Sequence, residues 1–227
     1  MIRRALRRLR GEEAGLSLAE LLVSGLLTIV IMAMIGSMFI QTAKITVNAT
    51  HVSKSNNVAA NIANELTSAI RVATTLPKSG SALPDPAIAE GSREKLVFYS
   101  LSNTSATDPS PVRITVSVKS DRTLEFERCT GNASGGFWTF GSCSSVEKRN
   151  LGGSLSPVAG TDQLFTYYTS NGTAINIGSG SLTAAQRATV AKIKVYVSIQ
   201  ATSGSATKPA VISNLVVLGN LGLDTGS

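Results

Sequence analysis

The first long pattern in the chain is an almost uninterrupted apolar run. Residues 16–40 read LSLAELLVSGLLTIVIMAMIGSMFI, with Glu20 as their only charge, and no further charge occurs before Lys44. A helix of that length measures roughly 37 Å, enough to cross a hydrocarbon layer of about 30 Å. The run therefore predicts one membrane-spanning helix. No second stretch of the chain is long and apolar enough to be another.

Helical spacing resumes beyond the apolar run. Apolar residues recur at intervals of four, four, four and three on one helix face: Val58, Ile62, Leu66, Ile70 and Ala73. We predict a single helix over about 17–75, ended by Pro77, with the stripe packed on a sheet. β-Branched residues lower helix propensity around 46–52 and predict a weaker junction there.

The remaining chain alternates between turn signals and strand signals. A Pro- and Gly-rich loop is expected over 77–94, and 120–122 suggests a hairpin turn. Thr183 and Gln186 have capping-box spacing, which predicts a short helix over about 184–190. Strands are predicted at 95–101, 113–119, 123–129, 164–169, 192–200 and 211–218, forming one antiparallel sheet. The fold class predicted is α+β: a long N-terminal helix, membrane-spanning in its first half, packed on an antiparallel β domain.

Charge distribution gives the helix an orientation. The 227-residue chain is 43% hydrophobic and 15% charged, with a net charge of +7; five Arg and two Glu give residues 1–15 a charge of +3. Since cytoplasmic flanks are enriched in Lys and Arg, the N-terminus is expected inside the cytoplasmic membrane and the chain beyond Lys44 outside. The remainder is only mildly basic, so a nucleic-acid-binding face is not indicated, although nothing in the sequence excludes one.

Glu20 does not fit a simple membrane anchor. A carboxylate in the middle of a membrane helix costs about 3 kcal/mol, and less near the ends. A positive partner would relieve that cost. An α-amino group created by a cut just before Leu16 would lie one turn away, or could meet Glu20 of a neighbouring copy. The run is too long for the apolar region of an ordinary secretory signal, and no A-x-A site follows it.

The residues around Glu20 carry a family resemblance. The segment EAGLSLAELLV at 13–23 resembles the processing signal of type IV pilins and type II secretion pseudopilins. The resemblance implies that prepilin peptidase cuts between Gly15 and Leu16 and methylates the amino group of Leu16. It also implies that Glu20 serves filament assembly with other pilin or pseudopilin subunits. Leu16 stands where Phe is commonest in the family, and the Pro found in many major pilin helices is missing, which favours a minor subunit.

The resemblance extends more weakly to the C-terminal part, where TVAKIKVYVSIQA and SNLVVLGN look like J-type minor pseudopilins and related minor pilins. The expected organisation is a leader over 1–15, a transmembrane and assembly helix over 16–43, an amphipathic continuation over 44–76 and a globular β domain over 77–227. The expected cellular course runs from the cytoplasmic membrane into a filament or pseudopilus.

The two cysteines, Cys129 and Cys143, flank TGNASGGFWTFGS. In an exported domain they most simply pair, and closing such a loop is worth about 3 kcal/mol. Aromatic residues inside the loop fit packing better than a binding surface.

Enzyme chemistry is not indicated by any motif. The sequence lacks the P-loop, HExxH, CxxC and GxSxG patterns, and its one histidine, His51, falls on the membrane side of the helix. Glu125 and Glu127 read most simply as one solvated strand face. No cofactor or metal is expected. The leading hypothesis is a non-enzymatic structural subunit of a type IV pilus or type II secretion pseudopilus; the alternative is a signal-anchored extracellular binding module that does not polymerise.

Overall fold

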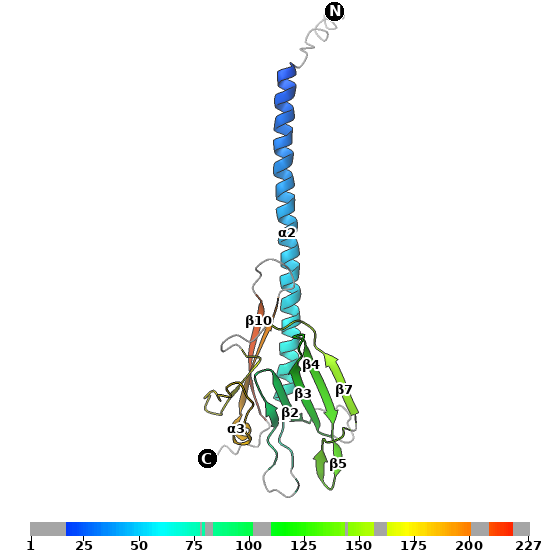
Figure 1. Cartoon of the computed structure of the whole chain (residues 1–227), viewed down its shortest axis with the longest axis vertical. Coiled ribbons are helices and arrows are strands. Elements are labelled where there is room, and N and C mark those ends of the chain that lie inside the picture. Colours follow the sequence, from blue (N-terminus) through cyan, green and yellow to red (C-terminus); the bar gives the residue numbers. More distant parts are fainter. Residues whose placement is uncertain are drawn as a thin grey trace, which may run out of the picture. The chain divides into compact units, whose positions relative to one another are not determined.

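The computed structural model describes residues 17–77, 79, 84–101, 110–143, 145–156, 163–200 and 209–219. The chain divides into two compact units, Met1–Thr50 and His51–Ser227. One helix, α2 (Leu18–Arg71), runs from the first unit into the second, and antiparallel strands follow it (Figure 1). The predicted α+β class is confirmed.

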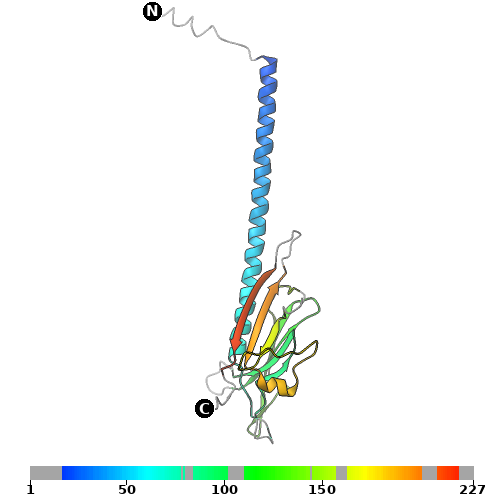
Figure 2. The same cartoon turned by 90° about the vertical axis from the view of Figure 1, so that its left-hand side faces the viewer.

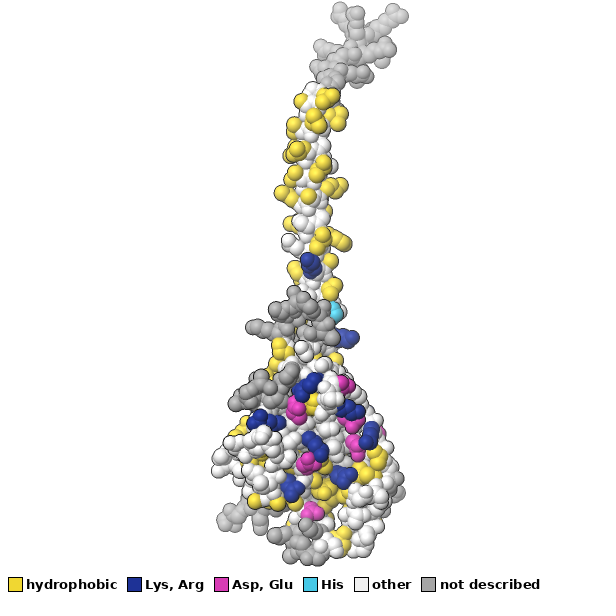
Figure 3. All heavy atoms as spheres, in the orientation of Figure 1, with side chains coloured by type: hydrophobic (Ala, Val, Ile, Leu, Met, Phe, Trp, Pro, Cys, Tyr) yellow, Lys and Arg dark blue, Asp and Glu magenta, His cyan; other side chains and the backbone are white. Residues whose placement is uncertain are grey.

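In the first unit, residues 18–50 of α2 are exposed along their whole length, and hydrophobic side chains cover that surface (Figure 3). The helix shows no break at the predicted weak junction. Thr46 and Thr50 each donate a side-chain hydrogen bond to the carbonyl four residues earlier, at 2.9 and 3.0 Å. These bonds satisfy the hydroxyls within the helix, so the β-branched residues do not interrupt it.

In the second unit, residues 51–71 bury the predicted apolar stripe. Ile62, Leu66 and Ile70 are at most 1% exposed, and Val58 packs against the same core. Ala59 and Ala63 are also buried, because their small side chains face the same neighbours. The stripe therefore packs on the β domain as its 3.6-residue period predicts.

The end of α2 differs from the prediction. The helix stops at Arg71, six residues before Pro77, because the next residues pair with a strand. Thr74 donates its backbone N–H to the carbonyl of Tyr99 at 2.9 Å, and Ala73 forms a bridge with Ser100. Ala73 is buried as predicted, but in this extended segment and not on the helix.

The β domain contains two main sheets, so the prediction of one sheet is wrong. The larger sheet has the order β1-β2-β3-β4-β7 and the smaller has the order β10-β9-β8; β5 and β6 form a separate hairpin. The larger sheet comprises β1 (Ile88–Gly91), β2 (Lys95–Ser100), β3 (Val112–Val118), β4 (Leu124–Thr130) and β7 (Ser145–Asn150). The others are β5 (Asn132–Ser134), β6 (Phe137–Thr139), β8 (Phe165–Tyr168), β9 (Lys192–Ile199) and β10 (Ala210–Val217).

Inward-facing residues of both sheets join the helix stripe in one core. On β3, Ile114 and Val116 are at most 2% exposed, which confirms the alternation seen in the sequence. The four inward residues of β9 are also buried: Ile193, Val195, Val197 and Ile199. In Figure 2 the strands β9 and β10 lie side by side along residues 51–71 of α2, its outer half.

Two local predictions from turn chemistry are confirmed. Helix α3 (Ala184–Thr189) begins at a complete capping box between Thr183 and Gln186. At the β3–β4 turn, Asp121 accepts hydrogen bonds from the backbone and side chain of Thr123, which lowers the pKa of its carboxyl group. Arg122 takes a left-handed φ of 64° there, and its guanidinium bonds Glu94 at 2.7 Å, tying the turn to the β1–β2 connection.

Candidate functional site

The residues predicted to be cut and methylated, Gly15 and Leu16, lie outside the described residues, which begin at Ser17. The rest of the motif is visible as the start of α2. Ser17 precedes the helix, and its Oγ accepts a hydrogen bond from the backbone N–H of Glu20 at 3.2 Å. Its carbonyl accepts the first helical bond, from the N–H of Leu21 at 3.1 Å. Ser17 is therefore the N-cap of α2, and Glu20 occupies the third helical position.

This spacing gives Glu20 a structural role that the sequence reasoning missed. Ser17 and Glu20 have the S-x-x-E spacing of a capping box, the same signal that was recognised at Thr183. An acidic residue in the first turn also interacts favourably with the helix dipole, by typically 0.3–1 kcal/mol. That gain is smaller than the cost of about 3 kcal/mol for a carboxylate inside a membrane. The helix dipole therefore offsets only part of the cost of the Glu20 carboxylate.

The apolar part of α2 satisfies its own hydroxyl groups. Thr28 donates to the carbonyl of Ser24 at 2.8 Å, Ser37 to that of Met34 at 2.8 Å, and Thr42 to that of Met38 at 2.9 Å. In hydrocarbon an unpaired polar group costs several kcal/mol. The segment is thus both long enough and internally satisfied enough to cross a membrane, and it is the one described helix that passes the length and hydropathy test.

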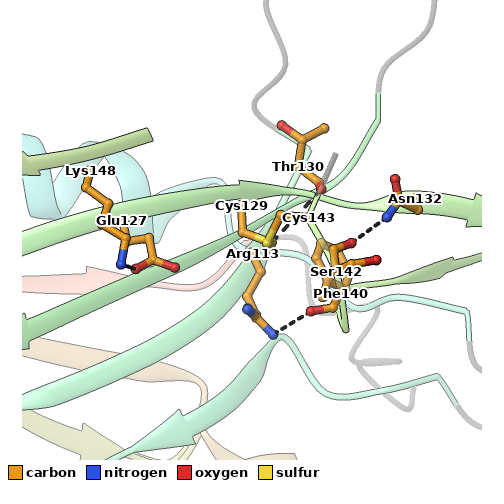
Figure 4. The surroundings of a disulfide bond; sticks show 9 residues. All are labelled: Arg113, Glu127, Cys129, Thr130, Asn132, Phe140, Ser142, Cys143 and Lys148. Atoms are coloured by element: carbon orange, nitrogen blue, oxygen red, sulfur yellow. Dashed lines mark hydrogen bonds and ion pairs between the residues drawn. A yellow bond between two sulfur atoms is a disulfide. The ribbon is translucent and has the colours of Figure 1, made fainter. Parts of the chain in front are cut away.

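The cysteine loop lies at the end of β4. Cys129 and Cys143 are joined by a disulfide, with their Cα atoms 5.3 Å apart, so the predicted pairing is present (Figure 4). Between them β5 and β6 pair around Gly135 and Gly136, both with positive φ. A Gly-Gly pair is a hairpin signal, and it marks this turn in the sequence.

Phe140 holds this loop against the large sheet. Its ring lies 5.2 Å from that of Tyr99, and the Arg113 guanidinium lies 5.8 Å from the Phe140 ring centre. Arg113 also donates a hydrogen bond to the Phe140 carbonyl at 3.1 Å (Figure 4). Phe140 therefore packs, as predicted, and the disulfide anchors a loop that covers one end of the sheet.

The carboxylates of Glu125 and Glu127 share one face of β4, as predicted, and each is paired with a lysine. Lys119 lies 2.5 Å from Glu125, and Lys148 lies 2.7 Å from Glu127. The hydrogen bond and charge of Glu127 raise the pKa of Lys148. Both carboxylates are thus occupied by ion pairs across the sheet surface, and neither lines the two cavities described below.

A groove of about 450 Å³ lies between the outer half of α2 and the large sheet. Its lining consists of Glu65, Ser68, Ala69, Val72, Ile114, Phe126, Arg128 and Arg149. The guanidinium of Arg149 pairs with Glu65 and stacks 4.8 Å from the centre of the Phe126 ring. This arrangement ties the helix to β7 across the groove by charge and by cation–π contact.

A second hollow, of about 320 Å³, lies on the small sheet beside Thr166, Tyr168, Lys194 and the segment 174–178. Neither lining contains a cysteine or a histidine, and the one carboxylate of the groove, Glu65, is paired with Arg149. Among the described residues, no group of three or more His, Cys, Asp or Glu side chains could hold a metal ion. His51 lies on α2, away from both cavity linings.

Among the described residues, Tyr167 is the one whose pKa is strongly shifted, and its role is structural. Tyr167 is fully buried, and its hydroxyl donates to the carbonyl of Ser92 at 2.8 Å. Burial, with the nearby charge of Glu90, raises the pKa of this phenol above its usual range. Tyr167 therefore stays neutral and joins the two sheets.

Comparison of the chain with family models, with curated proteins and with solved structures finds no match. Function has to be argued from the chain itself, and the feature that stands out is the start of α2.

Proposed function

We propose that this chain is a minor structural subunit of a type IV pilus or type II secretion pseudopilus. In this proposal prepilin peptidase cuts after Gly15, Leu16 becomes the methylated N-terminus, and the apolar part of α2 packs with the helices of neighbouring subunits. The protein is held in the cytoplasmic membrane with its N-terminus inside and its β domain outside, until it enters the filament. It needs no cofactor and catalyses no reaction.

Glu20 is the observation that carries the proposal. It is the only charge between Glu13 and Lys44, and it lies within the EAGLSLAELLV segment that resembles a prepilin signal. The helix dipole offsets at most about 1 kcal/mol of an insertion cost of about 3 kcal/mol. A free α-amino group on Leu16 of an adjacent subunit would offset the remainder, because opposite charges attract strongly where water is scarce.

The alternative is a signal-anchored binding module that does not polymerise. The groove of about 450 Å³ beside α2 is the observation in its favour, since a binding module needs a cavity on its exported domain. The ion pair between Glu65 and Arg149 lies in the lining of this groove, so part of the groove is occupied by the protein's own side chains. In this alternative Glu20 would act only as part of the helix cap.

Cleavage separates the two proposals. The mass of the protein extracted from membranes should correspond to residues 16–227 plus one methyl group. Gly15→Val should keep residues 1–15 attached, because a peptidase pocket shaped around glycine rejects a larger side chain. Normal maturation of Gly15→Val would show that the resemblance at 13–23 is misleading.

Assembly tests the role of Glu20 directly. Glu20→Ala and Glu20→Gln should leave export, cleavage and folding of the β domain intact, and should strongly reduce cross-linking to other pilin-like subunits. Ser17→Ala is the matched control, since it removes the N-cap at a cost of about 1 kcal/mol and keeps the carboxylate. If Ser17→Ala reduces cross-linking as much as Glu20→Ala does, the cap and not the charge is what matters.

A further inference from the structure

The two main sheets have four edge strands, and two of these edges are covered by the chain itself. On β1, the carbonyl of Gly91 accepts from the N–H of Leu182 at 2.7 Å, and the carbonyl of Ala89 accepts from the Arg187 side chain. On β8, the carbonyl of Tyr167 accepts from the N–H of Ile175 at 2.8 Å. Both strands are also short, with four residues each. Neither offers a long open edge to another chain.

The third edge, β7, is protected by charge. Its sequence is SVEKRN, and all six residues are exposed. Lys148 and Arg149 are held in ion pairs with Glu127 and Glu65. A run of charged side chains along an edge discourages a second apolar strand from pairing with it.

The fourth edge, β10, is neither short nor charged, and no described strand or loop bonds its outer backbone groups; its Asn214 side chain donates a hydrogen bond to Thr67 of α2 at 3.2 Å. It is eight residues long, carries no charge and pairs with β9 in an unbroken register. Val211, Leu215 and Val217 remain 46%, 59% and 56% exposed. A long, regular, uncharged edge with apolar side chains is one that soluble proteins normally avoid unless it pairs with another chain.

The hydrogen-bond pattern shows which backbone groups of β10 are open. The N–H of Leu218 points to β9, where it donates to the carbonyl of Ala191 at 3.0 Å. In an antiparallel pair this direction alternates from residue to residue. The backbone N–H and C=O groups of the even-numbered residues of β10 therefore point to β9, and those of the odd-numbered residues point to the outer edge. The residues whose backbone groups point to the outer edge are Val211, Ser213, Leu215 and Val217. Within the described part of the chain, no backbone hydrogen bond is made to these four residues on that side.

The face beside this edge is basic. Lys192 and Lys194 on β9 lie opposite Val217 and Leu215, on the same outward face of the sheet. The outward residues that follow on β9 and β8 are Tyr196, Ser198, Thr166 and Tyr168, so no described strand of this sheet places an acid there. A strand added to β10 would lie about 10 Å from the two lysines, within one Debye length at 0.1 M salt.

We propose that β10 is a docking edge, which accepts an extended strand from another protein chain as a fourth strand of the small sheet. On the outward face of the sheet the partner strand carries apolar side chains, which pack on Val211, Leu215 and Val217, and on that same face acidic side chains directed at Lys192 and Lys194. Backbone bonds to the four odd-numbered residues supply affinity, and the side chains supply selectivity. This proposal depends on the β domain alone and stands whether or not the chain is cleaved or forms filaments.

The test uses the full-length chain in a non-ionic detergent and two capped octapeptides. In the first, Val and Glu occupy one face of the strand and Thr occupies the other; the second has Lys in place of Glu. The acidic peptide should bind saturably and should slow hydrogen exchange at the amides of the four odd-numbered residues. The basic peptide should bind at least about threefold more weakly, because two lysines oppose it.

Two variants and one control make the test specific. Ser213→Pro removes one edge-facing N–H without removing a bond to β9, and should weaken binding by at least about fivefold. Leu215→Glu should weaken binding of the acidic peptide and reverse the preference between the two peptides. Val146→Pro is the matched control, because Val146 is an exposed, edge-facing residue of β7; it should bind as wild type does. Exchange protection at the even-numbered amides of β10 reports that each variant is folded.

The proposal is overturned if the acidic peptide gives no saturable binding, or if the odd-numbered amides exchange equally fast with and without it. It is also overturned if folded Ser213→Pro binds as tightly as wild type. Equal loss of binding in Val146→Pro would place the peptide on β7 and would likewise contradict it.

Discussion

The two halves of α2, residues 18–50 and residues 51–71, belong to one continuous helix but bury different shares of their side chains. Residues 18–50 leave every side chain exposed, whereas residues 51–71 bury six of theirs in the β domain. In the first half apolar residues surround the helix, as in a helix whose environment is uniformly apolar. In the second half they form one stripe, and the other faces carry Asn, Ser and Thr. Both the share of apolar residues and their distribution around the helix separate the two halves.

The comparison predicts its largest contrast for a leucine in each half. Leu66→Ala should lower the free energy of unfolding of the β domain by about 2–5 kcal/mol, since Leu66 is fully buried in the core. Leu27→Ala should leave the unfolding of that domain unchanged, because Leu27 is 55% exposed and lies in the other unit. Thermal denaturation of the detergent-solubilised chain measures both. Equal destabilisation by the two variants would contradict the division of α2 into two halves.

A second contrast concerns the disulfide. Replacing Cys129 and Cys143 with serine opens a loop of 14 residues and should lower the stability of the β domain by about 3 kcal/mol. The effect should be confined to the β domain, so the chain should still be extracted with membranes. Denaturant unfolding with and without reductant checks the stability, and membrane fractionation checks the anchor. An anchor lost together with the disulfide would mean that the two halves are coupled.

The smallest expected effect concerns the polar face of residues 51–71 of α2. Glu65 and Arg149 form the ion pair that crosses the groove between α2 and β7. Both side chains are partly exposed, so a double-mutant cycle of Glu65→Gln and Arg149→Met should give a coupling of about 0.2–1 kcal/mol, decreasing with added salt. A coupling several times larger would mean that charge, and not the buried stripe, holds the helix on the sheet.

Sequence patterns predicted the strands rich in apolar and β-branched residues and missed the polar strand β7. The β3 and β9 strands place an apolar residue at every second position, and both were found in their predicted places. The β7 strand was missed because SVEKRN has one apolar residue and is exposed throughout. Its pairing depends on the neighbouring strand β4, which supplies the backbone partners and the ion pair between Lys148 and Glu127.

The candidate site likewise has features that the sequence predicts and features that it does not. Ser17 and Glu20 could be recognised from spacing alone, and Cys129 and Cys143 from their number and the expected compartment. The groove could not, because its lining comes from α2, β3, β4 and β7, which are far apart in sequence. Nor could the open edge of β10, since the sequence does not say which strand of a sheet stands at its edge.

The sequence by itself determined the apolar helix, the buried stripe, the short capped helix and the cysteine pair, because each depends on residues close together in the chain or on composition. Only the tertiary structure decided that the strands form two sheets and that α2 ends at Arg71. It also decided that β10 has β9 as its one neighbour among the described strands. These features depend on backbone pairing between distant segments, and backbone groups are the same for nearly every residue type. Side-chain patterns report which face of a strand is buried, but they do not report which neighbour the strand chooses.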